Sequence, residues 1–329
     1  MGRLNECEPS VVGLGNCVMA YMARVPQILP PGEKGLITEM APRPGGVTVD
    51  ALVQLAHLGV STGWLGLLGV DGTGKSLVQA LQDEHVDTQY VRLQEGGSSS
   101  YCWVLTDFAG ERTGYCDLGV TARITPKQVD AFFGDAIRRL DHLLLEVSQF
   151  PLCSVLSAAS IARAASIPII LDFDSAPSAA TGKFGTKEEV ENVVRMCSAV
   201  SGSYVAMRDF TEAGEPRDIA ARFLAWGVGI VAVTLGGDGC YITDGKTSEL
   251  IPAFPVDVKD STGAGDAFHG GFSFGVINEL EPGRIGRIGN ACGAFCCGSR
   301  ENFGRASLDQ ILEIAGMPDL LEGSGESGK

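Results

Sequence analysis

Basic residues, long apolar runs and metal-binding cysteine patterns are all scarce in this sequence. Its 329 residues include 25 Lys and Arg against 40 Asp and Glu, which gives a formal net charge of −15. Nucleic acids and anionic membranes both bind basic protein surfaces, so neither is expected as a partner. No apolar run reaches the roughly 18 residues that a membrane-spanning helix needs, so no membrane insertion is expected.

The ten cysteines are scattered along the chain without the spacing of a metal site. The one close set is Cys292-x3-Cys296-Cys297, and adjacent cysteines rarely ligate one metal. It lies in a stretch rich in alanine and glycine, where small buried thiols are expected. Because the N-terminal residues also show no signal-peptide pattern, we expect reduced cysteines and a cytoplasmic protein.

Continuous apolar strands and amphipathic helices alternate over most of the chain. Strands are expected at 10–15, 61–69, 141–147, 168–172 and 229–235. Helices are expected at 47–58, 74–84, 126–140, 152–165, 187–197 and 219–226. Fully apolar strands alternating with helices predict a parallel sheet covered on both faces, which is an α/β fold.

Two segments do not follow that alternation and predict a small β appendage. Residues 17–25 and 35–41 alternate weakly, as exposed strands do. Residues 98–117 are typical of a hairpin that turns at Ala109-Gly110. The polar, glycine-rich end of the chain, residues 322–329, is expected to be disordered.

The strongest chemical signal is the run Asp260-Ser-Thr-Gly-Ala-Gly-Asp266, which a helical pattern follows. Gly263 and Gly265 on either side of Ala264 leave the backbone amides at a helix start unshielded. Such amides, with the helix dipole behind them, form a site for a phosphate or a developing oxyanion. A carboxylate in the same turn suits removal of a proton from an attacking hydroxyl. The run therefore predicts phosphoryl transfer with Asp266 as the base.

This run, with the following Ala-Phe, resembles the C-terminal signature of the PfkB/ribokinase family of carbohydrate kinases. Gly45-Gly46 and the helical pattern after it resemble the family's N-terminal glycine pair. The segments Gly69-Val-Asp-Gly-Thr-Gly74 and Thr234-Leu-Gly-Gly-Asp-Gly239 fall where the family has recurrent loops. The resemblance implies a ribokinase-like three-layer α/β/α sandwich with a mostly parallel sheet. It also implies a small β-sheet lid over the sugar site and a kinase that depends on ATP and Mg²⁺, with a requirement for K⁺ left open.

The resemblance also implies a division of the chain and a set of site residues. The kinase core would comprise 8–16, 47–97 and 118–318, the lid 17–46 and 98–117, and a disordered tail 319–329. The amides of Gly263, Ala264 and Gly265 would form the anion hole beside the base Asp266. The residues expected along the nucleotide are Thr234, Gly236, Gly237, Gly239, Thr262 and Asn290. Those expected to contact the sugar-like substrate are Asn16, Lys34, Gly45, Gly46 and Asp50.

Several positions depart from the family pattern. Ala20 stands where many members have a sugar-binding aspartate, and Asp50 stands where they often have asparagine. Either a hydroxyl-binding carboxylate has moved to position 50, or Asp50 is a first-turn helix charge. Ser203-Tyr-Val-Ala206 replaces the family's N-x-x-E motif, which helps to organise the metal. Asp172 and Asp174 are better placed to act on Mg²⁺ through bound water, because ligands gather at the carboxyl ends of parallel strands.

The substrate stays open. The sulfofructose kinase branch is similar at Leu171-Asp-Phe-Asp174, at Asp266-Ala-Phe-His269 and at Lys34. Lys34 would suit an anionic sugar substituent or is a solvated loop lysine, and the arginine expected near 147–149 is missing. His269, one helical turn after Asp266, would tune that carboxylate, touch the substrate or pack the helix.

Two alternatives come from other functional classes. Residues Gly69 to Ser76 match the P-loop pattern G-x-x-x-x-G-K-[ST], follow an apolar strand and open a helix. The family loop is the favoured interpretation, with Lys75 and Ser76 exposed, because only the later glycine loop carries a base. Loss of the aspartate at position 20 and of N-x-x-E suggests instead a catalytically weak binding or regulatory protein. For the favoured kinase interpretation, exposed edges of the lid strands would pair in a homodimer.

Overall fold

A computed structural model describes residues 9–174, 183–299, 305–318 and 320. The predicted tail 319–329 lies outside these residues except for Leu320. Within the described ranges, every helix is too short or too polar to cross a lipid bilayer.

The main sheet has ten strands among the described residues, and most of them are parallel. Its order is β14 (Ser248–Ile251), β13 (Cys240–Thr243), β12 (Ile230–Thr234), β11 (Ala199–Ser203), β10 (Ile169–Phe173), β9 (His142–Glu146), β1 (Val11–Leu14), β4 (Thr62–Gly69) and β5 (Val86–Asp87), with β6 (Val91–Gln94) also paired to β4. Only β13 and β14, at one edge, run antiparallel to their neighbours. The sequence pattern missed β11, whose Ala-Val-Ser-Gly-Ser is poor in large apolar residues.

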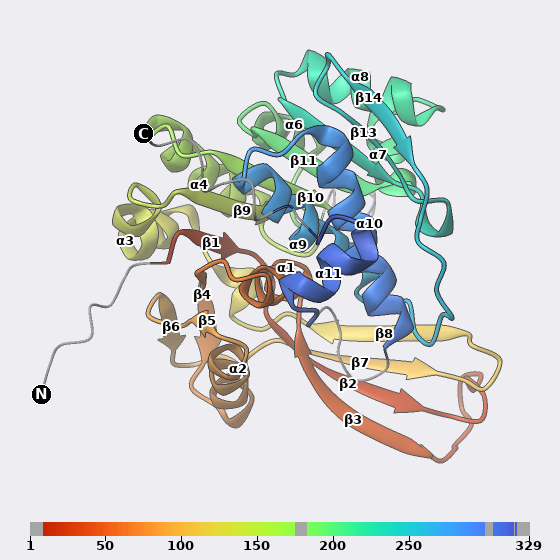
Figure 1. The fold of residues 1–329 in the computed structure, drawn as a ribbon. Helices are drawn as coiled ribbons and strands as arrows, with labels where there is room; N and C mark the ends of the chain where they lie inside the picture. The colour runs from red at the N-terminus through yellow and green to blue at the C-terminus, as the bar shows by residue number, and fades with distance from the viewer. Residues whose placement is uncertain (1–8, 175–182, 300–304, 319, 321–329) are drawn as a thin grey trace, which may run out of the picture.

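Helices cover both faces of this sheet and bury two separate hydrophobic cores (Figure 1). One face carries α3 (Pro126–Ile137), α4 (Leu152–Ala164), α6 (Lys187–Val194), α7 (Tyr204–Thr211) and α8 (Pro216–Ala225). The other carries α1 (Val47–His57), α2 (Gly72–Asp83), α9 (Ala264–Ile277), α10 (Pro282–Gly298) and α11 (Leu308–Ala315). Successive strand residues point to opposite faces, so Leu143 and Leu145 join the first core and Leu144 the second. This is the predicted three-layer α/β/α sandwich.

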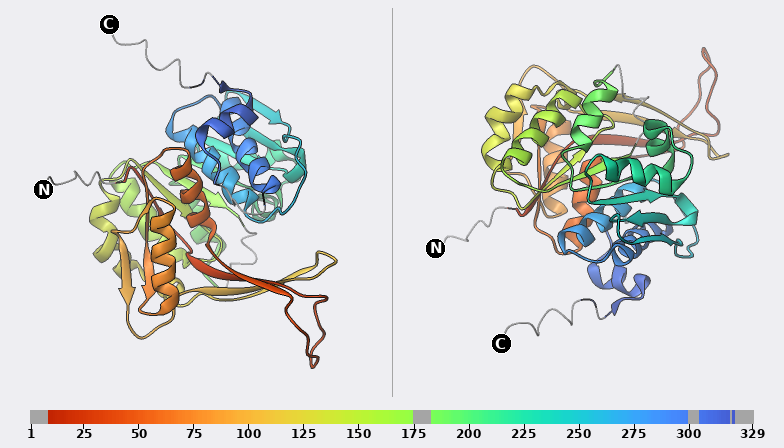
Figure 2. Two further views of the ribbon diagram at one scale, coloured as in Figure 1. Left: turned by 60° about the horizontal axis from the view of Figure 1, so that its bottom comes forward. Right: turned by 90° about the horizontal axis from the view of Figure 1, so that it is seen from above.

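A second, four-stranded sheet projects from one end of the sandwich (Figures 1 and 2). Its order is β3 (Glu39–Gly45), β2 (Val18–Arg24), β7 (Tyr101–Thr106) and β8 (Arg112–Asp117). We call it the small sheet. The hairpin expected at 98–117 is present, but the strand expected at 35–41 lies at 39–45 and contains Pro42 and Pro44. Proline is tolerated there because β3 is an edge strand and needs no amide donor on its outer side.

The expectation that all cysteines are reduced is wrong for one pair in this structure. Cys102 and Cys116 stand directly opposite each other on β7 and β8 and form a disulfide. The register of the hairpin brings them together, and their spacing in the sequence gave no sign of it. Cys292 and Cys296, by contrast, are the buried thiols that their alanine- and glycine-rich segment predicts.

Candidate active site

The glycine loop before α9 presents open backbone amides at a helix start. Gly263 has φ +79°, a conformation that glycine adopts readily, and its carbonyl accepts the first helical hydrogen bond from Ala267 at 2.9 Å. The amide of Ala264 donates to the carbonyl of Ser261 at 3.2 Å. Among the described residues, the amides of Gly263 and Gly265 donate to no protein group. Two of the three amides expected in the anion hole are therefore available to an anion.

Asp266 lies in the first turn of α9, surrounded by charged groups from four other segments. Burial raises the pKa of Asp266 well above its usual range, and the carboxylates of Asp50, Asp174 and Glu146 raise it further. Arg43, from the small sheet, lowers it. A high pKa makes this carboxylate a better proton acceptor once it is ionised, which is what a general base needs.

A cleft of about 600 Å³ opens on one side of the glycine loop. It is lined by residues from distant segments, including Thr234, Gly236, Gly237, Gly239, Asn290, Ala264 and Gly265. The structure thus brings together five of the six residues expected along the nucleotide. Phe254, Val256 and Val258, which the sequence reading did not single out, add an apolar wall.

Two of the expected nucleotide residues have structural partners. Asn290 donates from Nδ2 to the carbonyls of Ile251 and Pro252, at 3.1 Å each, and so ties α10 to the end of β14. Thr262 is not among the residues that line the cleft, and its hydroxyl accepts a hydrogen bond from Nη1 of Arg112 on β8 at 2.9 Å. That contact links the small sheet to the glycine loop.

The segment that matches a P-loop is closed by its own aspartate. Asp71 accepts hydrogen bonds from the amides of Gly74 at 2.7 Å and Ser99 at 2.8 Å, so it occupies the place where a phosphate would have to lie. A carboxylate there also repels phosphate. Lys75 is exposed on the first turn of α2. The structure favours a capped helix start over a nucleotide site.

On the other side of Asp266, a buried carboxylate organises the end of β1. Glu146, the last residue of β9, accepts hydrogen bonds from the amide of Asn16 and from the hydroxyls of Thr48 and Ser148. The side chain of Asn16 is buried, and its Oδ1 has no hydrogen-bond partner within the described part of the chain. Sequence reading missed Glu146, although an acid that ends the apolar run Leu-Leu-Leu-Glu was a usable signal.

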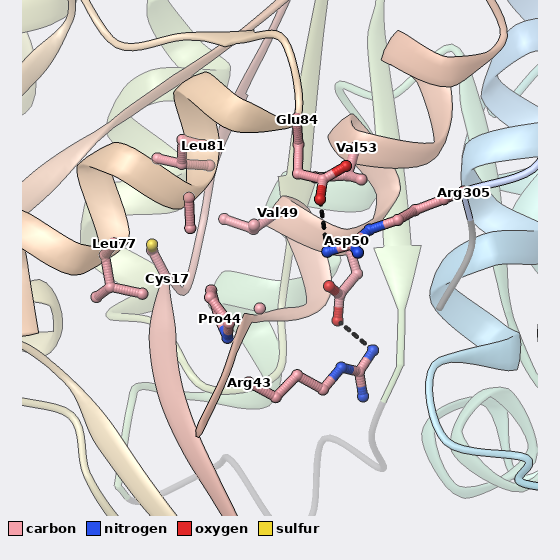
Figure 3. A pocket seen from close by; sticks show the side chains of 12 residues that line it. Cys17, Arg43, Pro44, Val49, Asp50, Val53, Leu77, Leu81, Glu84 and Arg305 are labelled. Atoms are coloured by element: carbon pink, nitrogen blue, oxygen red, sulfur yellow. Dashed lines mark hydrogen bonds and ion pairs between the residues drawn. The ribbon is translucent and has the colours of Figure 1, made fainter. Parts of the chain in front are cut away.

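Asp50 faces the site and is paired with an arginine. Its Oδ2 lies 3.5 Å from Nη2 of Arg43, and the two side chains are 18% and 14% exposed. Figure 3 shows Arg43 pointing at Asp50 while Arg305 beside it reaches Glu84. Burial raises the pKa of Asp50, and Arg43 and Arg305 oppose the shift. Asp50 is therefore more than a charge on a helix surface.

Gly45 and Gly46 let the backbone pass close to the carboxylate of Asp50 and to the carbonyl group of Asn16. A Cβ on Gly45 would lie 3.0 Å from both carboxylate oxygens of Asp50, and one on Gly46 would lie 2.3 Å from the carbonyl oxygen of Asn16. Gly46 has φ +131°, which side chains rarely allow. The two glycines thus contribute to the site through this close packing of their backbone, which a side chain at either position would disturb.

Lys34, Asp172 and His269 lie in three different surroundings. Lys34 is exposed in the loop between β2 and β3, which extends away from the sandwich (Figure 2). Asp172 is 5% exposed, and its Oδ2 lies 3.9 Å from Nδ1 of His269. His269 also bonds Ser201 through Nδ1 at 2.7 Å, and burial lowers its pKa to about 3, so it is a neutral packing residue.

Asp174 is better placed than Asp172 for a metal-bound water. Burial raises the pKa of Asp172 well above its usual range, which favours its uncharged form. Asp174, two residues later, is exposed just beyond the end of β10. No group of three or more candidate ligands forms a metal site within the residues that the structure describes.

A family model and several relatives match this chain over most of its length. Residues 8–302 match the family model described as pfkB family carbohydrate kinase. An uncharacterized sugar kinase of Archaeoglobus fulgidus is 29% identical over 77% of this chain and 98% of its own length. An ATP-dependent ribose-1-phosphate kinase of Halopiger xanaduensis is 30% identical over 77% of this chain and 80% of its own length.

Solved structures share the fold. Arabidopsis thaliana ribokinase, complexed with ribose and ATP, has a TM-score of 0.82 at 20% identity, covering 94% of this chain and 99% of that one. An Escherichia coli protein solved with ATP and Mg²⁺ has a TM-score of 0.79 at 21% identity, covering 94% and 99%.

Proposed function

Because the chain belongs to the pfkB family of carbohydrate kinases, we propose that it transfers the γ-phosphoryl group of ATP to a hydroxyl of a sugar or sugar-like molecule, with Asp266 as the base. The observation that carries this proposal is the position of Asp266. It lies in the same helical turn as the open amides of Gly263 and Gly265. Ala264 and Gly265 of the same turn line the large cleft, and the carboxylate of Asp50 is close enough to raise the pKa of Asp266.

Each of these groups has a part in the proposed phosphoryl transfer. The acceptor hydroxyl gives its proton to Asp266 and attacks the γ-phosphorus, and the bond from that phosphorus to ADP breaks. The amides of Gly263 and Gly265 donate to the oxygens of the transferring group, where charge is held during transfer. The apolar wall at Phe254 and Val256 suits the flat face of a nucleotide base. Asn16 and Asp50 would bind hydroxyls of the acceptor.

Mg²⁺ fits a site of this kind if it is held mainly by phosphates and water. Mg²⁺ keeps several waters and needs only one or two carboxylates, which agrees with the lack of a three-ligand cage among the described residues. Asp174, one of the two aspartates expected to act through metal-bound water, would contact its water shell. When bound, the ion neutralises charge on the β- and γ-phosphates. Dependence on K⁺ stays a prediction, as does the cytoplasmic location.

A substrate panel tests the proposal. Purified protein with ATP and Mg²⁺ would be given sugars, sugar phosphates, polyols and nucleosides, and ADP release would be measured. We expect release that depends on one class of acceptor, and ribose and ribose 1-phosphate are natural first choices from the relatives' names. Tight binding of one compound without any turnover would instead indicate the binding or regulatory alternative.

The pH dependence of turnover should show the raised pKa of Asp266. Only the ionised carboxylate can accept the proton of the acceptor, so activity should fall as the pH drops through this pKa. Since burial and the neighbouring carboxylates raise the pKa, the loss should begin at higher pH than for an ordinary aspartate. A profile of kcat/KM that stays flat down to the usual aspartate range would contradict this assignment.

We also propose that the small sheet is the lid and that its outer face joins two copies of the chain. Tyr21 and Trp103 stack there with ring centroids 5.0 Å apart, and Tyr115 beside them is 72% exposed. Such an exposed aromatic patch is typical of an interface. Light scattering should give twice the 34.5 kDa chain mass, and a Trp103→Ser, Tyr115→Ser double variant should be monomeric. A monomeric wild-type protein would rule the dimer out.

A further inference from the structure

We propose that Arg43, on the edge strand β3 of the small sheet, contacts the phosphoryl group in transit and stabilises its charge. This inference rests on the proposed function and deepens it, because it assigns a catalytic residue that the motifs did not indicate. Neither the glycine loop nor the glycine pair includes Arg43. The only local signal is its place between two prolines just before Gly45.

The guanidinium of Arg43 lies against the amide loop. Its Nη2 is 3.0 Å from the point that a Cβ on Gly263 would occupy. The amide of Gly263 is one of the two that donate to no protein group among the described residues. A side chain at position 263 would displace the arginine. Arg43 therefore reaches the glycine loop from the small sheet, and glycine at position 263 makes room for it.

The register of the small sheet explains why Arg43 points inward. Arg43 pairs with Ala20 on β2, and Ala20 pairs with Cys102 on β7. Directly opposed residues share a face of a sheet, and side chains two apart along a strand also share it. Arg112 on the other edge strand, β8, lies on this same face and touches Thr262. The face of the small sheet that carries Arg43 and Arg112, its inner face, thus directs an arginine from each edge strand toward the glycine loop.

Charge balance requires a cation at this position. Asp50, Asp174 and Glu146 all raise the pKa of Asp266, and Asp174 also raises that of Glu146; a transferring phosphoryl group adds further negative charge. Arg43 acts to lower the pKa of Asp50 on α1 and of Asp260 and Asp266 at the two ends of the glycine loop. The charge of Arg43 therefore acts both on the proposed base, Asp266, and on Asp50, which is proposed to bind the acceptor. The planar fork of arginine also matches phosphate oxygens.

The competing explanation is that Arg43 only neutralises the carboxylate of Asp50. The contact between Nη2 of Arg43 and Oδ2 of Asp50 is 3.5 Å long, at the outer limit of a hydrogen bond. An arginine dedicated to that carboxylate would be expected in a two-pronged pair at shorter distance. The looser geometry is better suited to a side chain that exchanges partners as the phosphoryl group arrives.

The test compares Arg43→Gln, Arg43→Lys and wild type in nucleotide binding and in turnover. Calorimetry with Mg²⁺ should show that Arg43→Gln binds ATP about 10-fold more weakly while ADP binding stays unchanged, because only ATP carries the γ-phosphate. With an acceptor, kcat should fall about 100-fold or more, and the acceptor KM should change less than about 3-fold. Arg43→Lys should recover part of both losses, because it keeps the charge without the fork.

Arg24→Gln is the matched control. Arg24 is an exposed arginine of the same small sheet, at the end of β2 where it pairs with Glu39. The strand rises about 3.3 Å per residue, so Arg24 lies roughly 13 Å beyond the level of Arg43. Its replacement removes the same charge and should leave the ratio of ATP to ADP affinity as in wild type.

The outcomes separate this inference from the proposed function. If no acceptor is turned over by wild type, the proposed function fails, yet the ratio of ATP to ADP affinity still decides the role of Arg43. An unchanged ratio in Arg43→Gln would overturn the inference. So would a rise in acceptor KM with kcat unaffected, because it would make Arg43 a partner of the acceptor alone. Thermal unfolding shows whether Arg43→Gln is folded, and Arg43→Lys gives the answer if it is not.

Discussion

Replacing Asp266 with asparagine should lower kcat by about 10²- to 10⁴-fold while ATP affinity changes little. The expected size is that of losing a positioned general base. Asparagine keeps the shape of the side chain but cannot take the proton of the acceptor hydroxyl. The nucleotide cleft is lined by backbone and side chains that this change does not touch, including Gly236 and Gly237. ADP release and calorimetry measure the two quantities separately.

Asp218→Asn provides the control for that substitution. Asp218 is also an aspartate in the first turn of a helix, α8, but it is exposed and belongs to the other face of the sheet. Its replacement should leave kcat unchanged. Turnover by Asp266→Asn within a few-fold of wild type would remove Asp266 from the role of base. Loss of ATP binding along with turnover would indicate that the substitution had damaged the cleft.

Replacing Gly46 with alanine should lower the free energy of unfolding by about 3 kcal/mol and weaken acceptor binding. The new Cβ would lie 2.3 Å from the carbonyl oxygen and 2.9 Å from the carbonyl carbon of Asn16. Both are backbone atoms, which cannot swing aside as a flexible side chain would. The backbone at φ +131° is also unfavourable for alanine. Because Asn16 shifts with its backbone, the acceptor KM should rise.

Gly59→Ala separates backbone strain from collision. Gly59 has φ +87°, yet a Cβ there would meet nothing within 4 Å. Its replacement should cost about 1 kcal/mol, the ordinary cost of a left-handed alanine. Urea unfolding of both variants gives the comparison. Equal losses at positions 46 and 59 would show that contact with Asn16 is not the cause.

Two features of the sequence each had two interpretations, and contacts between distant segments favour one interpretation of each. The P-loop match at Gly69 to Ser76 was complete in letters, but Asp71 fills the loop by bonding both Gly74 and Ser99. Ser99 comes from the connection to the small sheet, so the sequence pattern could not include it. Asp50 was equally consistent with a helix cap or a site residue, and its pairing with Arg43 on β3 favours the site.

The sequence alone determined the sandwich and the glycine loop with Asp266. Both depend on local rules: strand and helix periodicity, and the freedom of Gly263 at a helix start. The tertiary structure decided which other groups stand beside Asp266. Asn16 and Glu146 are 130 residues apart, and Arg112 and Thr262 are 150 apart. Such contacts arise from strand register and from packing of the small sheet against the sandwich, which no local pattern encodes. For the same reason Arg43, now the proposed cation of the site, had no motif to mark it.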